Sequence, residues 1–256
     1  MVIESDNPLG MVRDSYAGDS FVLPPTLCTD ERRSWFRRCK EIIGFLTITD
    51  LSLKECRIKY EQLLSQKNLR LDTPLQLKFS DGRSARMPVS KFLNGCNEGV
   101  EFLSRQVFVM LYGAWENYLS ELLEKSIPQV GISKNILEDV LLIMMRGNWD
   151  GKFCKMRDRL GIEYRAGDLI KHFENYKMNY DGKTIKNPLI FLDHLAQIRH
   201  KIVHASSMLD NGKPIFIKAD ILPGLFSFFV LLTEYVDNLF SKKFSYVQSK
   251  INPAEA

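Results

Sequence analysis

The chain has 256 residues, of which 45% are hydrophobic and 26% are charged, and 35 basic against 31 acidic side chains leave a formal net charge of +4. These are values of a folded globular protein, and they exclude a disordered chain, a fibrous repeat and a disulfide-knotted peptide. The charge permits an anionic partner but is far from the dense positive charge of a histone-like binder.

We expect neither a membrane span nor a signal peptide. The most apolar stretch, residues 221–233, contains Pro223 and Gly224 and is shorter than the roughly 18 apolar residues that a span needs. Residues 1–6 lack the basic and apolar regions of a signal peptide. The number of cysteines, five, is odd, and no two of them form a CxxC pair. We therefore expect reduced core thiols and a cytoplasmic location. They are Cys28, Cys39, Cys56, Cys96 and Cys154.

The first third of the chain predicts an arm, two helices and a hairpin. Residues 1–28 carry glycines and a Pro-Pro pair without a sustained period, which indicates a tail or a surface-wrapping arm. A helix is expected from Thr29, which can cap it, and a second helix from about 51 to 68. Apolar and polar residues then alternate on both sides of Asp81-Gly82, which predicts a small β hairpin appended to the helices. We take residues 29–94 as one unit.

The rest of the chain predicts a helical bundle over residues 95–245, followed by a C-terminal tail over 246–256. The expected fold is therefore mostly α-helical, with one core and the hairpin as an appendage. A turn is expected at Asp181-Gly182 and a short strand at 215–217. The helices are expected at about 95–125, 133–145, 151–160, 167–178, 188–206 and 223–240.

The helix that begins at Pro188 carries an arginine on its apolar face. At about 100° per residue, the apolar side chains fall between about 0° and about 160° from Ile198, and Arg199 lies near 100°, in the middle of that arc. A guanidinium cannot lose its charge, so its burial requires a carboxylate partner or an anion. Glu116, on the long preceding helix, is a candidate for that carboxylate.

Three titratable residues share the opposite edge of this helix. Asp193, His200 and His204 lie on one stripe, with the two histidines one turn apart. Arg199 and His204 are separated by about 140° around the helix and by about 7.5 Å along it. They can flank one cleft only if a second helix or a second subunit closes it.

Two structural alternatives stay open for these residues. Arg199 can be a structural ion pair inside a helix bundle, and the two histidines can be ordinary helix residues. The spacing of His200 and His204 also fits two metal ligands, which would make the protein a metal-dependent hydrolase. The residues between them lack the Glu of an HExxH motif, however, and no third ligand is evident, so we expect no metal and no cofactor.

The segment Arg199-His200-Lys201-Ile202-Val203-His204 resembles the signature of the HEPN superfamily, an arginine followed by a polar residue, three further residues and a histidine. Residues 110–119 are similar to the first core helix of HEPN-like nucleases from bacterial defence loci. The resemblance covers roughly residues 95–240 and leaves the N-terminal helices and the hairpin outside it. It implies an α-helical bundle and, for many members, a toxin or defence ribonuclease.

The resemblance also implies a mechanism and a set of partners. Members dimerise with their motif helices facing each other, so that one cleft draws its Arg and His from different subunits. Here His204 would be an acid or base, Arg199 would stabilise the phosphate, and His200 would be a second acid/base or orienting group. Glu116 and Asp193 are supporting residues. The partners are then an RNA substrate, a second copy of the chain, and an antitoxin or defence-system component.

Further support for RNA binding comes from residues 31–70, which hold ten basic and five acidic side chains. Trp35 and Phe36 lie among the first of these and can stack on bases, although we favour a solvated helix face with Trp35 in the core. A second basic cluster at residues 152–159 is interpreted as solvated too. The candidate RNA contacts are Arg32, Arg33, Arg37 and Arg38.

These patterns lead to two functional hypotheses. The first is a metal-independent HEPN endoribonuclease that acts as a toxin or as an effector of antiviral abortive infection. The second is a non-catalytic HEPN-fold module that binds a nucleotide or a protein through the same residues.

Overall fold

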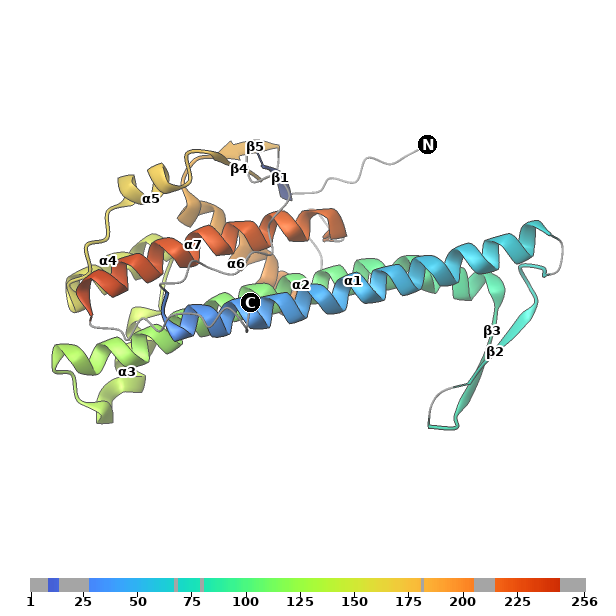
Figure 1. The fold of residues 1–256 in the computed structure, drawn as a ribbon, viewed down its shortest axis with the longest axis horizontal. Helices are drawn as coiled ribbons and strands as arrows, with labels where there is room; N and C mark the ends of the chain where they lie inside the picture. The colour runs from blue at the N-terminus through green and yellow to red at the C-terminus, as the bar shows by residue number, and fades with distance from the viewer. Residues whose placement is uncertain are drawn as a thin grey trace.

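Two long antiparallel helices form the spine of the molecule (Figure 1). The computed structural model describes residues 9–13, 28–66, 69–78, 81–180, 182–204 and 215–244. Helix α1 spans Asp30–Ser65, and α2 spans Val89–Ser126. The other helices gather around one end of this pair: α3 (Leu137–Met144), α4 (Trp149–Leu160), α5 (Ala166–His172), α6 (Pro188–His204) and α7 (Leu222–Lys243), with 3₁₀ turns at Ile127–Val130, Lys134–Ile136 and Ala219–Ile221.

The strands make two small antiparallel sheets. Strands β2 (Pro74–Lys78) and β3 (Ser84–Pro88) form the hairpin that the Asp-Gly pattern predicts, at the end of the spine away from the helical body (Figure 1). Strands β1 (Leu9–Arg13), β4 (Tyr176–Tyr180) and β5 (Lys183–Ile185) form a three-stranded sheet in the order β1-β4-β5. The prediction of a mostly α-helical fold with a small hairpin is confirmed.

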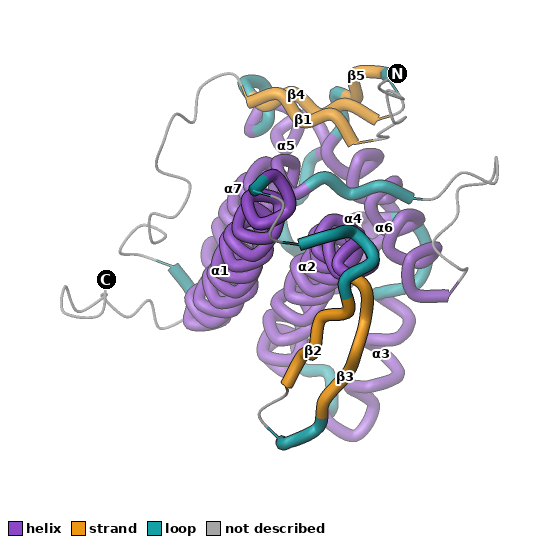
Figure 2. Tube along the Cα trace, turned by 90° about the vertical axis from the view of Figure 1, so that its right-hand side faces the viewer, coloured by secondary structure: helices purple, strands orange, loops and turns teal. Residues whose placement is uncertain are grey.

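One aromatic-rich core joins α1 to the later helices. Trp35 and Phe36 of α1 are each 1% exposed and pack on Phe226 of α7, and Trp35 also packs on Tyr118 of α2. The view in Figure 2 shows α2 between α1 and α6, and α2 contacts both. Full burial of large side chains gives the dominant favourable free energy of folding, about 25 cal/mol per Å² of apolar surface. The core therefore runs across the expected boundary at 94/95, which falls inside α2.

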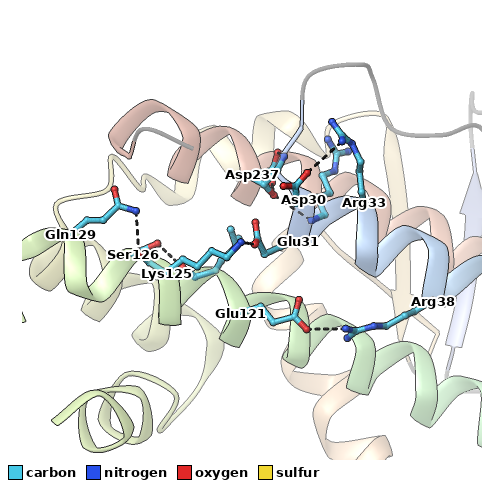
Figure 3. A network of polar contacts seen from close by, with 12 residues as sticks. Asp30, Glu31, Arg33, Arg38, Glu121, Lys125, Ser126, Gln129 and Asp237 are labelled. Atoms are coloured by element: carbon cyan, nitrogen blue, oxygen red, sulfur yellow. Dashed lines mark hydrogen bonds and ion pairs between the residues drawn. The ribbon is translucent and has the colours of Figure 1, made fainter. Parts of the chain in front are cut away.

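The start of α1 is fixed by a buried polar cluster. The Thr29 hydroxyl caps the helix by accepting from the Arg32 amide, and it donates to the Asp237 carboxylate of α7. Asp237 also accepts from the Thr29 amide at 3.1 Å and from the Tyr118 hydroxyl at 3.3 Å. Figure 3 shows this region, where Lys125 of α2 also pairs with Glu31. Burial raises the pKa of Asp237, while these hydrogen bonds and Arg32 act in the opposite direction.

Three expectations about the elements were wrong. The two helices predicted before the hairpin are one continuous helix, α1. The helix predicted at 167–178 ends at His172, and residues 176–180 are strand β4. No strand is formed at 215–217, where the chain is extended without a sheet partner among the described residues. The arm expected over residues 1–28 contributes β1, and its other residues before Cys28 lie outside the described part, as do residues 205–206 and the tail 246–256.

The cysteines are free thiols, as expected. Cys28, Cys39 and Cys96 are buried, and burial raises the pKa of each. Cys56 is exposed and Cys154 is half-buried, so these two differ from the expected core position.

Candidate functional site

Helix α6 carries the motif, and its sequence explains its placement. Pro188 occupies the first turn, where a missing amide has no cost, and the Leu189 amide donates to the Asn187 side chain at 2.9 Å. One face then packs into the core, with the members Leu189, Phe191, Leu192, Leu195 and Ile198 all buried. This packing fixes the rotation of the helix and hence the direction of every motif residue.

Arg199 lies at a helix-helix interface, as its position in the apolar arc predicts. The side chain is half-buried beside Glu116 of α2. Its positive charge acts to lower the pKa of both Glu116 and Tyr112. Its Nε is buried and has no hydrogen-bond partner among the described residues. It forms no ion pair within 4 Å with any described carboxylate. A buried N–H without a partner costs free energy, so Arg199 is held in a position that an anion would stabilise.

Glu116 is the carboxylate that the sequence suggests as the partner of Arg199. It is half-buried on α2, and burial raises its pKa, while the charges of Arg199 and Lys152 act to lower it. Burial and the two neighbouring cations thus act on the pKa of Glu116 in opposite directions. Glu116 lies near enough to Arg199 for their charges to interact, but it forms no direct ion pair with either cation among the described residues.

Asp193 has a structural task in addition to its electrostatic one. Its Oδ1 accepts from the Trp149 amide at 2.9 Å, at the first residue of α4, and so ties α4 to α6. Burial raises its pKa, opposed by this hydrogen bond and by the charge of Lys152. Asp193 thus joins the cluster of Arg199 and Glu116 through α4.

Lys152 is the member of this cluster that the sequence argument missed. It was assigned to a solvated basic cluster, but it is 9% exposed, and its Nζ lies 3.8 Å from the centroid of the Trp149 ring. Burial lowers its pKa, while the charges of Glu116 and Asp193 raise it. On α4, Lys152 lies about 40° outside the arc formed by Trp149, Phe153, Met156 and Leu160, so the pattern of that helix does not by itself predict its burial. The two cations and two carboxylates form a half-buried site, the α2-α4-α6 cluster: Arg199, Lys152, Glu116 and Asp193.

His200 and His204 lie outside this cluster, on the solvent side of α6. Both are exposed, and their ring centroids are 4.9 Å apart at an interplanar angle of 46°. Within one subunit Arg199 and the histidine pair therefore occupy different sides of the same helix, whereas Asp193, about two to three turns earlier, shares the stripe of the histidines.

The four arginines of the predicted RNA contact are only partly available to a ligand. Arg32 is 2% exposed and lies 3.7 Å from Glu234, so it is not a surface residue. Arg33 pairs with Asp30 at 3.4 Å, and Arg38 pairs with Glu121 at 3.0 Å (Figure 3). Arg37 is exposed. Trp35 and Phe36 belong to the core, which removes them as base-stacking residues.

Two further observations bear on alternatives. No group of three His, Cys, Asp or Glu residues with metal-ligand geometry occurs in the described part of the chain. The segment Ala219–Lys243 is long and apolar enough to cross a membrane by length and composition, but 61% of its most apolar window is buried in the protein, which is typical of a core helix.

No protein-family model matches this chain, and neither a curated protein nor a solved structure shows significant similarity to it. The resemblance to the HEPN superfamily therefore depends on the motif residues themselves.

Proposed function

We propose that the protein is a metal-independent RNA endonuclease of HEPN type that acts as a homodimer. The observation that carries this proposal is Arg199, a half-buried guanidinium with an unpartnered Nε, on the same helix as the exposed His200–His204 pair. An arginine that lacks a direct carboxylate partner is suited to bind the oxygens of a phosphate. Imidazoles titrate near neutral pH and can move the protons that RNA cleavage requires.

The reaction needs only the RNA and these side chains. The ribose 2′-OH attacks the adjacent phosphorus and loses its proton to a base, while the bond from phosphorus to the 5′-oxygen breaks and that oxygen gains a proton from an acid. The products are a 2′,3′-cyclic phosphate and a 5′-hydroxyl. We assign one proton transfer to His204 and the second to His200 of the same subunit. Arg199 stabilises the additional negative charge on the phosphorane.

The remaining charged residues position Arg199. Glu116 attracts the guanidinium electrostatically from α2, and Lys152 adds a second positive charge on the same side of α6. Asp193 holds α4, and with it Lys152, against α6. Because Arg199 and the histidines lie on different sides of one helix, a two-fold axis that passes between two facing copies of α6 would bring the Arg of one subunit to the His of the other.

The second hypothesis is a HEPN-fold module that binds a nucleotide or a protein without cutting RNA. It would use the same α2-α4-α6 cluster, with the anion held by Arg199 and Lys152. In either case we expect a cytoplasmic protein, and for the nuclease a toxin or antiviral abortive-infection role with a neutralising partner.

The proposal is tested by incubating purified protein with total RNA in EDTA. We expect cleavage by the wild type and a loss of roughly 10²–10⁴-fold in rate for both Arg199→Ala and His204→Ala. Arg86→Ala, at an exposed position of β3, is the matched control and should cut at the wild-type rate. Cleavage by the His204→Ala variant at the wild-type rate would remove His204 from the mechanism.

A further inference from the structure

A groove of about 570 Å³ lies where the β4–β5 hairpin meets the first turns of α6. Its volume is within the roughly 300–1,000 Å³ of pockets that hold small organic ligands. The groove is separate from the α2-α4-α6 cluster, whose residues do not line it. The residues that line it include Tyr180, Lys183, Thr184, Lys186, Ile190 and His194.

An aromatic pair lines this groove. The rings of Tyr180 and His194 are stacked, with centroids 4.0 Å apart and planes within 8° of each other. The Nδ1 atom of His194 is buried and has no hydrogen-bond partner among the described residues. A flat stacked pair can be extended by a third ring, and nucleobases stack on aromatic side chains regardless of their sequence.

The charge of the groove favours an anion. Lys183 and Lys186 are exposed, and none of the described residues that line the groove is a carboxylate. The hydroxyl of Thr184 donates its hydrogen to the Asn179 side chain at 3.0 Å, so the two lysines are the donors that the groove offers to an anion. Ile190, 50% exposed, adds an apolar surface next to the lysines. A flat ring together with a phosphate satisfies all of these features, and a nucleotide carries both.

The groove is continuous with the side of α6 that carries the histidine pair. Ile190, Gln197, His200 and His204 are all exposed along this side, and His194 is half-buried between them. His194 and His204 are ten residues apart, or about 15 Å along the helix axis. That distance corresponds to about four phosphates of a helical strand at about 3.4 Å each, and to fewer in an extended strand.

We propose that this groove binds one nucleotide of the RNA strand, a few nucleotides from the phosphate at His204. The base stacks on the Tyr180–His194 pair and the phosphate is held by Lys183 and Lys186. This assignment rests on the proposed function, because it takes the strand to be the substrate of the motif residues. It gives the nuclease a second point of attachment that fixes the register of the strand relative to the cut.

The test measures binding separately from cleavage. The probe is an end-labelled 12-nucleotide RNA of mixed sequence with every 2′-OH methylated, so that the proposed reaction has no nucleophile. Its affinity is measured by fluorescence anisotropy between 50 and 200 mM salt. The groove variant is Lys183→Ala combined with Lys186→Ala. The matched control is Lys91→Ala combined with Lys242→Ala, two exposed lysines of α2 and α7 with the same change of charge.

For the groove variant, we expect the slope of log affinity against log salt to fall by about 0.7, the value for one lost phosphate contact to a single strand. Tyr180→Leu should weaken binding about fivefold or more with an unchanged slope, and Tyr180→Phe should restore it. The control should keep the wild-type slope. Wild-type affinity and slope in the groove variant, or the absence of any binding by the wild type, would overturn the assignment.

Two more outcomes separate the sources of the ligand and the two proposals. Free AMP should compete only at millimolar concentration, and AMP that binds as tightly as the oligonucleotide would overturn the RNA-strand assignment in favour of a free nucleotide. Groove-dependent binding by a protein that cuts no RNA would contradict the nuclease and leave the groove assignment standing. Cleavage by a protein whose RNA binding does not depend on the groove would contradict the groove assignment and leave the nuclease standing.

Discussion

Glu116 is a half-buried carboxylate that burial disfavours and two cations support. Burial is the larger influence, since the pKa of Glu116 is raised in spite of Arg199 and Lys152. The fold therefore holds the Glu116 carboxylate beside the guanidinium although burial destabilises its ionised form. A residue that costs stability in its ionised form is expected where function and not folding has selected it.

Replacement of Glu116 by Gln should therefore stabilise the fold at neutral pH. Because the folded pKa lies above the usual 4.5, the folded state holds the proton more tightly than the unfolded state, and the free energy of unfolding falls as the pH rises through this window. Glutamine removes that loss. Urea unfolding should show Glu116→Gln more stable than wild type at pH 7, with a difference that shrinks toward pH 4.

The control for this variant is Glu124→Gln, at an exposed position of the same helix. It should follow the wild type at both pH values. A Glu116→Gln protein that is less stable than wild type at pH 7 would mean that the attraction to Arg199 outweighs burial.

At the residue scale, the sequence predicted the cluster in part. A charged residue inside an apolar arc was recognised for Arg199, and Glu116 was found next to it. The same test applied to α4 does not find Lys152, which lies about 40° outside the apolar arc of that helix. The burial of Arg32 could not be predicted in this way, because its partner Glu234 is 202 residues away in sequence and only the packing of α1 on α7 brings them together.

The elements follow local patterns except where a pattern has two explanations. Helix α1 was divided because residues 44–52 include Gly44, Thr47, Thr49 and Ser52, which have low helix propensity. Each of the three hydroxyls donates to the carbonyl four residues earlier, which satisfies it within the helix. Packing along α2 supports the helix through this stretch. Tertiary contacts thus override a local preference.

The β4–β5 hairpin was missed although its signal matches that of β2–β3. Burial alternates along Tyr176, Lys177 and Met178, and an Asp-Gly pair follows at 181–182, as it does at 81–82. The pattern was interpreted as the end of a helix because α5 precedes it directly. Only the pairing of β4 with β1, from the N-terminal region, makes it part of a three-stranded sheet.

The β2–β3 hairpin should be dispensable for folding. Its strands alternate between exposed and half-buried residues, and it lies at the end of the spine away from the core (Figure 1). A two-stranded ribbon is at best marginally stable by itself. We expect that replacing residues 75–87 by a short Gly-Ser linker changes the melting temperature by only a few degrees. Loss of the cooperative thermal transition, followed by circular dichroism, would contradict this.

At the scale of the whole molecule, the separation of Arg199 from the histidines predicts a composite site. Arg199→Ala and His204→Ala proteins should each be inactive, but a mixed dimer would contain one intact cleft, with Arg from one subunit and His from the other. Half of the dimers in an equal mixture are mixed, and each has one of two clefts intact, so about a quarter of the wild-type activity should return.

The mixture is assayed after unfolding and refolding together, with differently tagged subunits to verify that mixed dimers form. Mixed dimers without activity would place the complete site within one subunit. An entirely monomeric protein in sedimentation experiments would contradict the dimer itself.

The most direct test of the account is the chemistry of the RNA ends made by the wild-type protein in EDTA. Cleavage by 2′-OH attack at Arg199 and His204 predicts 2′,3′-cyclic phosphate and 5′-hydroxyl ends, which polynucleotide kinase can label at the 5′ side without prior phosphatase treatment. Products with 5′-phosphate ends, or cleavage that requires added metal, would contradict the metal-independent mechanism.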